Sequence, residues 1–440
     1  MTTFKASVSA GDRRAAGAGN TTIGGIAATV TKGPLPFRLT AFDGSEAGPP
    51  EGPGLHINNR RALTYVVTAP GDLGLVRAYV SGDIDFLDLH PADPYELLKL
   101  MDDGLHLRRP SAAEIKDIVL SLGMKTFVPV SPPPQEATPR WRRMVNGVRH
   151  SKKRDSAAIS KHYDVSNTFY EHVLGPSMAY TCAVYSSPDI SLEQAQDGKH
   201  ALVFDKLGLQ PGERLLDVGC GWGSMVRHAA RRGVRTLGVT LSRQQAEWGQ
   251  KAIVEEGLQH LAEIRYLDYR DVPETDFDAV SSIGLTEHIG VKKYPAYFRA
   301  LQDKLRPGGR LLNHCITRPD NISNTHPEAF IDRYVFPDGE LTGSGRIITT
   351  MQDVGFDVRH SENLREHYAL TLRDWCANLQ ENWDACVREV GQGSARVWGL
   401  YMAASRLSFE RNGIQLQQVL AVKPGAKGDA DVPLRPWWSG

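Results

Sequence analysis

A short glycine-rich segment in the middle of the chain most constrains how it can fold. The apolar run Arg214-Leu215-Leu216-Asp217-Val218 is typical of a buried strand, and Gly219-Cys220-Gly221-Trp222-Gly223 follows at once. A helix is predicted from Ser224 to Arg232. Glycine allows backbone to approach a ligand closely, and a helix N-terminus offers free N–H groups. The segment therefore predicts a ligand-binding loop at the end of a buried strand.

The loop leaves three interpretations to compare. A dinucleotide fingerprint, G-x-G-x-x-G, requires glycine three residues after Gly221, where Ser224 stands. Asp217, just before the glycines, fits the amino acid moiety of a methyl donor better than a pyrophosphate. A glycine-rich turn without a ligand is the third interpretation.

Strands and helices alternate on both sides of this loop. A helix is predicted from Ser242 toward Glu256, and two long amphipathic helical stretches between Leu370 and Phe409. Further strands are predicted at 236–240, 264–267, 277–282, 310–314 and 415–422. The fold class is therefore α/β, a mostly parallel sheet with helices on both faces.

The 440 residues divide by composition into five segments. Two β-rich runs, 63–68 and 75–80, predict a hairpin in a small α+β domain. The expected segments are a loosely ordered stretch 1–54, the α+β domain 55–130, a Pro-rich and basic linker 131–155, the main domain 156–424, and a disordered tail 425–440.

Charge is balanced overall, with 51 basic and 51 acidic residues, but one stretch is strongly basic. It contains Arg140, Arg142, Arg143, Arg149, Lys152, Lys153 and Arg154. A solvated linker and contact with anionic lipid headgroups are both consistent with it. No nucleic acid partner is expected, because nothing nearby supplies a base-reading element.

Five cysteines form no CxxC pair, and they predict neither a disulfide framework nor a metal site. No apolar stretch approaches about 18 residues, and no secretory signal is evident. A cytoplasmic protein is expected.

Several ordered motifs together resemble the cyclopropane-fatty-acid synthase family, which includes the mycolic acid cyclopropane synthases and belongs to the class I S-adenosylmethionine (SAM) methyltransferases. They extend from about His162 to Val422. Besides the glycine loop they are 162–167 (HYDVSN), 178–183 (MAYTCA), 238–245 (GVTLSRQQ), 268–271 (DYRD), 287–290 (EHIG), 314–316 (HCI) and 367–372 (HYALTL). The domain 55–130 resembles the additional N-terminal domain of the phospholipid-acting members.

The resemblance implies a set of SAM-binding residues and a class I methyltransferase fold. The implied residues are Tyr163, Tyr180, Thr181, Asp217, Gly219, Cys220, Gly221, Trp222, Thr240, Leu241, Gln245, Tyr269 and Arg270. Many SAM enzymes carry an acid at the end of the second strand to hold the ribose. Here Val239-Thr240-Leu241 has none, and Gln245 is the expected polar partner.

The resemblance also implies the chemistry. Methyl transfer to a cis double bond leaves a carbocation, and a bound bicarbonate ion then removes a proton. The residues implied to hold bicarbonate are Cys182, Glu287, His314, the backbone of Ile316, and Tyr368. Some members carry a cysteine in the C-terminal helix once regarded as catalytic. Ser405 stands at that position here, and the bicarbonate scheme does not need it.

The implied function is conversion of unsaturated acyl chains of phospholipids to cyclopropane fatty acids, by an enzyme peripheral to the inner membrane surface. A methylene-branched product is an alternative, and a separate reductase would then act next. A homodimer is left open. Rivals of another class are a methyltransferase for a small molecule or a protein, and a non-catalytic lipid-binding paralogue.

Overall fold

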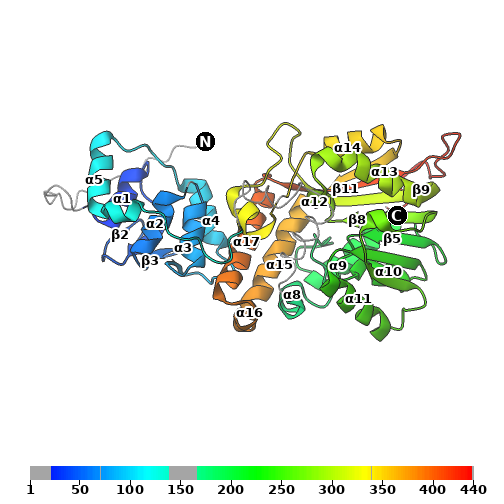
Figure 1. Ribbon diagram of the computed structural model, residues 1–440, viewed down its shortest axis with the longest axis horizontal. Helices are drawn as coiled ribbons and strands as arrows, with labels where there is room; N and C mark the ends of the chain where they lie inside the picture. The colour runs from blue at the N-terminus through cyan, green and yellow to red at the C-terminus, as the bar shows by residue number, and fades with distance from the viewer. Residues whose placement is uncertain (1–20, 70, 138–165, 338, 439–440) are drawn as a thin grey trace. The chain divides into compact units, whose positions relative to one another are not determined.

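The computed structural model describes residues 21–69, 71–137, 166–337 and 339–438. The chain divides into two compact units (Figure 1). The first comprises Met1–Ala137 and Gly391–Leu407, and the second comprises Thr138–Val390 and Ser408–Gly440. The sequence alone assigns 391–407 to the main domain, but in the structure this segment packs within the first unit.

The first unit is built on a four-stranded sheet with the order β2-β1-β3-β4. β1 and β3 are parallel, and the outer pairs are antiparallel. Inward-facing Leu39, Leu55 and Ile84 belong to its apolar core. The elements are α1 (Ile23–Val30), β1 (Arg38–Ala41), β2 (Glu46–Ala47), β3 (Gly54–Ile57), α2 (Arg60–Thr68), α3 (Leu73–Val80), β4 (Ile84–Leu87), α4 (Tyr95–Gly104) and α5 (Ala112–Leu122).

Two expectations for this unit were wrong. The runs predicted as a hairpin form helices α2 and α3. Asn59 caps α2 by accepting the Arg61 amide, and the helix turns Ala62 and Tyr65 into the core, so tertiary packing overrides the β propensity of the sequence. Loose order was expected up to residue 54, yet α1 and the first strands lie there.

Arg396 of α17 (Gln392–Glu410) explains why 391–407 belongs to the first unit. Its guanidinium donates to the carbonyls of Tyr79 (2.9 Å) and Ile84 (3.2 Å) and to the Asp85 carboxylate (2.6 Å). Because Arg396 is only 7% exposed, these contacts compensate for burying its charge.

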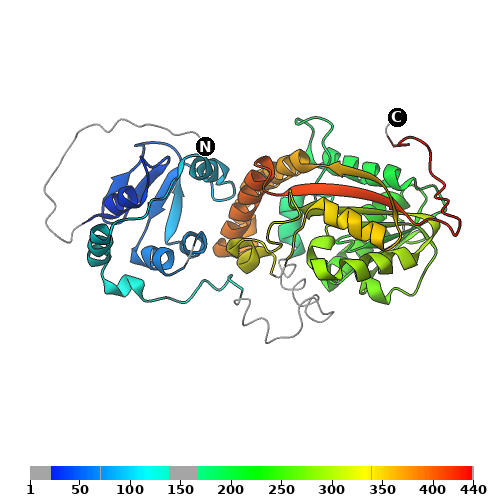
Figure 2. The same ribbon diagram turned by 90° about the horizontal axis from the view of Figure 1, so that it is seen from above.

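The second unit contains a seven-stranded sheet with the order β10-β11-β9-β8-β5-β6-β7. The five strands from β9 to β7 are parallel, whereas β11 is antiparallel to both β9 and β10. Figure 2 shows β11 as the long red strand. The strands are β5 (Arg214–Val218), β6 (Arg235–Thr240), β7 (Ala262–Tyr266), β8 (Phe277–Ile283), β9 (Leu305–Thr317), β10 (Asp357–Asn363) and β11 (Gln415–Val422). The predicted α/β class is confirmed.

Helices cover both faces of this sheet (Figure 1). Leu215 belongs to a core cluster that also contains Val203 of α9 and Met225 of α10, while the next residue, Leu216, joins one with residues of α13 and α14. This alternation is the one expected for a strand buried on both sides. The helices are α8 (Asn167–Leu174), α9 (Leu192–Leu207), α10 (Ser224–Ala230), α11 (Arg243–Glu255), α12 (Thr286–Ile289), α13 (Tyr294–Lys304), α14 (Ser344–Asp353), α15 (Arg365–Glu381) and α16 (Trp383–Val390).

The C-terminal segment also differs from expectation. Three helices, α15 to α17, replace the two helical stretches predicted between Leu370 and Phe409. Beyond β11, the tail predicted to be disordered packs through Trp437, whose indole donates to the Asp205 carbonyl (2.7 Å) and whose ring lies against the Arg310 guanidinium.

Candidate active site

The loop after β5 adopts backbone conformations that require glycine. Gly219, Gly221 and Gly223 have φ values of 72°, 55° and 77°. A Cβ at Gly223 would lie 2.2 Å from Ile264 Cδ1, so a side chain there would force Ile264 to move in addition to the strained backbone. At Gly221 a Cβ would meet nothing within 4 Å. Gly221 therefore presents bare backbone to open space, the feature that a closely approaching ligand requires.

A cleft lies beside this loop, at the carboxyl ends of the strands, where open α/β sheets bind their ligands. Seven of the residues implied for SAM binding line it, namely Gly219, Gly221, Thr240, Leu241, Gln245, Tyr269 and Arg270. Six others that the sequence did not single out also line it, namely Val239, Leu267, Gly284, Leu285, His288 and Ile289.

Gln245 is held at the end of the second strand by its neighbours. Thr240 Oγ1 donates to Gln245 Oε1 (2.8 Å), and the Ser242 side chain accepts the Gln245 amide at the start of α11. Because Oε1 is engaged, the side-chain NH2 is the end that can donate to a ligand hydroxyl. Across the cleft, Asp268 holds Arg270 through two bonds of 2.7 and 2.6 Å.

The other described residues of this set lie around the cleft rather than in its lining. Asp217 is 2% exposed and accepts a 2.6 Å bond from Ser281 Oγ, and burial raises the pKa of its carboxyl to about 7. The Trp222 indole donates to Asn167 Oδ1 (2.9 Å). Cys220 is buried in the core. Tyr163 lies outside the described residues.

Helix α9 fixes the loop that carries Tyr180, Thr181 and Cys182. Lys199 Nζ donates to Thr181 Oγ1 (2.9 Å), and Gln196 Nε2 donates to the Thr181 carbonyl (2.9 Å). Lys199 is 1% exposed, and burial lowers the pKa of its ammonium to about 8. No motif in the sequence signals this buried cation.

A second group of implied residues meets at α12 and β9. Glu287 Oε1 accepts the Ile316 amide (2.7 Å), while Oε2 is buried with no hydrogen-bond partner among the described residues. Burial raises the pKa of the Glu287 carboxyl to about 7. His314 is fully buried, and its Nε2 is likewise unpartnered within the described ranges. Burial holds the pKa of its imidazole well below the usual value.

Cys182 and Tyr368 are associated through the start of α15. Cys182 Sγ lies 3.8 Å from the Leu364 carbonyl, which also accepts the Tyr368 amide. Burial raises the pKa of the Cys182 thiol, so it remains neutral. Tyr368 contacts the ring of Trp375, which in turn contacts Tyr180. These contacts connect the two groups of implied residues.

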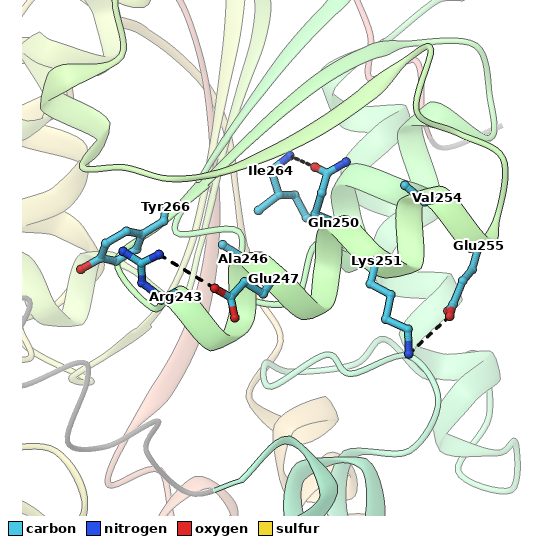
Figure 3. Close-up of a pocket in the computed structure, with 9 residues that line it drawn as sticks. All are labelled: Arg243, Ala246, Glu247, Gln250, Lys251, Val254, Glu255, Ile264 and Tyr266. Carbon is cyan, nitrogen blue, oxygen red and sulfur yellow. Dashed lines mark hydrogen bonds and ion pairs between the residues drawn. The ribbon is translucent and has the colours of Figure 1, made fainter.

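A larger depression, of about 700 Å³, lies elsewhere, over α11 and the edge strand β7 (Figure 3). Lys251 and Glu255 approach within 3.5 Å there, and Arg243 and Glu247 within 3.9 Å. None of the implied site residues lines it, so it offers control positions for experiments on the cleft.

Comparison with known proteins decides the family. The family model described as mycolic acid cyclopropane synthetase matches residues 150–419. The chain belongs to this family. It is therefore a SAM-dependent methyltransferase of the mycolic acid cyclopropane synthetase family, as the motifs predicted.

Two relatives and one solved structure show which members of the family this chain is similar to. It is 62% identical over 407 residues to a probable fatty acid methyltransferase of Mycobacterium tuberculosis, covering 92% of this chain and 95% of the relative. It is 29% identical over 404 residues to the tuberculostearic acid methyltransferase UfaA1 of the same organism, covering 89% and 88%. The cyclopropane synthase MmaA2 of M. tuberculosis superposes with a TM-score of 0.57 at 30% identity, covering 62% of this chain and 98% of that one.

The sequence analysis assigns no role to Leu285, His288 and Ile289, although they line the cleft. The signal was present, because His288 and Ile289 belong to the same motif as Glu287 and follow directly after β8. Within that motif the sequence analysis assigns a role to Glu287 only.

Proposed function

We propose that this enzyme transfers the SAM methyl group to the cis double bond of unsaturated acyl chains in phospholipids, and that the product is a cyclopropane fatty acid. The observation that carries the proposal is that two polar atoms, Glu287 Oε2 and His314 Nε2, are buried without a hydrogen-bond partner in the described part of the chain. Glu287 accepts the amide of Ile316, which lies two residues after His314 on β9. Buried polar atoms are almost always paired, so two such atoms on or beside one strand indicate a polar ligand.

The cleft beside Gly221 suits SAM. The glycine backbone leaves room for close approach, and the Gln245 amide is positioned to hold the ribose hydroxyls. SAM supplies an electrophilic methyl group, so an alkene can attack it without a side-chain base. Asp217, the last polar side chain before the loop, is held by its hydrogen bond from Ser281.

Ring closure releases a proton, and the residues around Glu287 are suited to hold a small anion that accepts it. We assign bicarbonate to this position, held by the side chains of Glu287, His314, Tyr368 and Cys182. The Ile316 backbone amide, which the resemblance also implies, already donates to Glu287 Oε1 and so orients that carboxyl. A carboxyl with a pKa of about 7 can remain protonated beside an anion and donate to it. Lys199 lies close enough to influence the pKa values of both Cys182 and His314, and it adds positive charge.

A second candidate product is a methylene-branched acyl chain. One observation favours it: the likeness to the tuberculostearic acid methyltransferase covers 89% of this chain, including the N-terminal unit, whereas the likeness to MmaA2 covers 62%. The two products differ only in which proton leaves. A separate reductase would then convert the methylene to a methyl branch.

The enzyme must reach an acyl chain that belongs to a bilayer. None of the helices in the described part of the chain is both long and apolar enough to cross a membrane. The basic stretch 140–154 lies outside the described residues, and its sequence supports docking to anionic lipid.

Transfer of labelled methyl from SAM tests the substrate class. The purified enzyme is incubated with vesicles of unsaturated phospholipid, vesicles of saturated phospholipid, or a free unsaturated fatty acid. We expect label in the acyl chains of the unsaturated phospholipid only. Label in the free fatty acid alone would reject the phospholipid assignment. No lipid labelling by a protein that binds SAM would favour a small-molecule methyltransferase, and a protein without SAM binding would be a non-catalytic paralogue.

A further inference from the structure

Three polar side chains stand in one row across the antiparallel part of the large sheet. Glu362 of β10 is paired in register with Gln418 of β11, and Gln418 is paired with His314 of β9. Directly opposed residues on neighbouring strands point to the same face of a sheet. Gln418 and His314 are both fully buried, so this row brings polar groups into the interior.

Lys206 of α9, a helix that packs on the sheet, contacts two side chains of this row. Its Nζ donates to Gln418 Oε1 (2.7 Å) and forms an ion pair with the Glu362 carboxylate. Lys206 is also fully buried, whereas the Glu362 side chain is 37% exposed. Burying an ammonium costs several kcal/mol, and an apolar side chain of similar size would often stabilise a fold equally well. Fold stability alone therefore gives a weak reason for this arrangement.

The chemistry of lysine determines how the Gln418 amide is oriented. An ammonium can only donate, so the Gln418 atom that faces Lys206 must be the oxygen. The NH2 group is then the end that lies 3.1 Å from His314 Nδ1. Because NH2 donates, Nδ1 must accept through its lone pair, and the single ring proton of a neutral imidazole must be on Nε2.

The protonated nitrogen is the unpartnered one. Nε2 is the His314 atom that lacks a hydrogen-bond partner among the described residues. Burial, together with the nearby Lys199 and Lys206, favours the neutral imidazole over the cation by lowering its pKa. His314 therefore presents one N–H donor at the site where an anion is proposed to bind.

We propose that Gln418 and Lys206 are positioning residues that hold His314 as the Nε2–H tautomer, so that it donates to the catalytic anion. Glu362 compensates the charge of Lys206. The role of the anion rests on the proposed function, whereas the tautomer does not. The opposite tautomer would present a lone pair to the anion and repel it.

Gln418→Glu changes the tautomer with little change in size. The new carboxylate still accepts from Lys206, but it can only accept from His314, so Nδ1 must carry a proton, and the spectrum shows whether Nε2 has lost its own. The matched control is Gln417→Glu. Gln417 is the preceding residue on β11, and it bonds to Ser361 and Gln415 instead.

Nitrogen NMR of histidine-labelled enzyme reads the tautomer directly, with the His314 signals assigned by their loss in His314→Gln. We expect Nε2–H in the wild type and in Gln417→Glu, and a protonated Nδ1 in Gln418→Glu. Wild-type His314 protonated on Nδ1 would overturn the proposal, whether or not the enzyme proves to act on phospholipids. Should Gln418→Glu fail to fold, the wild-type spectrum still decides this point.

Kinetics test the link to catalysis. In Gln418→Glu we expect kcat to fall at least about tenfold, because the variant removes a hydrogen-bond donor to a developing charge. The SAM Kd and the lipid KM should stay within about twofold of wild type. Lys206→Met should lower kcat in the same direction. Wild-type kcat in Gln418→Glu, with the tautomer shown to have moved, would contradict the positioning role.

Discussion

Glu287 Oε1 accepts a 2.7 Å hydrogen bond from the backbone amide of Ile316, which joins the short helix α12 to strand β9. This bond occupies one carboxyl oxygen and leaves Oε2 buried without a partner in the described part of the chain. Two residues implied separately by sequence motifs are thus in direct contact. The bond also positions the one acid that the proposed anion site contains.

Removing one hydrogen-bond donor from the proposed anion site should lower turnover and leave SAM binding intact. In Glu287→Leu, which removes the carboxyl without supplying the N–H donor that glutamine would, and in Tyr368→Phe, we expect SAM affinity near wild type and rates lower by about 10²–10³, the usual cost of losing one oxyanion donor. Calorimetry with SAM and a labelled-methyl assay measure the two effects. Glu247→Leu, at an exposed position on α11, is the control. Full activity of both variants in carbonate-free buffer would reject the bicarbonate assignment.

Stability should depend on pH through Glu287. Burial raises the pKa of its carboxyl from 4.5 to about 7, so between these values the folded chain binds more protons than the unfolded chain. The free energy of unfolding therefore falls as pH rises from 4.5 to 7, by on the order of 3 kcal/mol. Glu287→Gln lacks this contribution and should lose less stability than wild type between pH 5 and 8 in urea titrations. Parallel pH curves for the two proteins would contradict this account.

Gly221→Val should abolish SAM binding. Valine in this left-handed conformation costs about 1–2 kcal/mol of stability, and its side chain would fill the space that the backbone leaves open. Gly257→Val is the matched control, because Gly257 also has positive φ (71°) and a Cβ there would meet nothing within 4 Å. Calorimetry should show a SAM Kd at least about a hundredfold higher for Gly221→Val only. Equal Kd values in the two variants would reject the loop assignment.

The basic stretch 140–154 should contribute to the binding of anionic vesicles and not to the binding of SAM. Replacing Arg142, Arg143, Lys152 and Lys153 by Gln removes four of seven positive charges, each worth about 1 kcal/mol near an anionic surface. We expect weaker sedimentation with anionic vesicles, lower activity on them, and unchanged SAM affinity. High salt should reproduce the loss in the wild type. Unaltered vesicle binding would identify the stretch as a solvated linker.

Local patterns predicted six of the seven strands of the large sheet, because their apolar signals lie in consecutive residues. They missed the edge strand β10 (Asp357–Asn363), which has no fully buried residue and therefore no continuous apolar run. Arg214–Val218 and Gln415–Val422 form strands with the predicted bounds. The first unit was less predictable. Its runs 63–68 and 75–80 are rich in valine and tyrosine, yet both are helical. In α2 the cap by Asn59 and burial of Tyr65 outweigh local propensity, and in α3 burial of Val76 and Tyr79 does so.

The site was predictable only where motifs carry it. Gly219, Gly221 and Gln245, which the family's motifs mark, line one cleft in the structure. The pairing of Lys206 with Gln418 joins residues 212 positions apart, and it exists only because α9 packs over β11. No pattern among neighbouring residues in the sequence predicts such a contact.

The structure of the product tests the central claim most directly. Lipids modified by the enzyme should gain 14 mass units per modified chain, and fragmentation distinguishes a ring from a branch. The account predicts a cyclopropane at the position of the original cis double bond. A methylene branch in its place would contradict the proposed product and support the second candidate, and unmodified acyl chains would contradict the account as a whole.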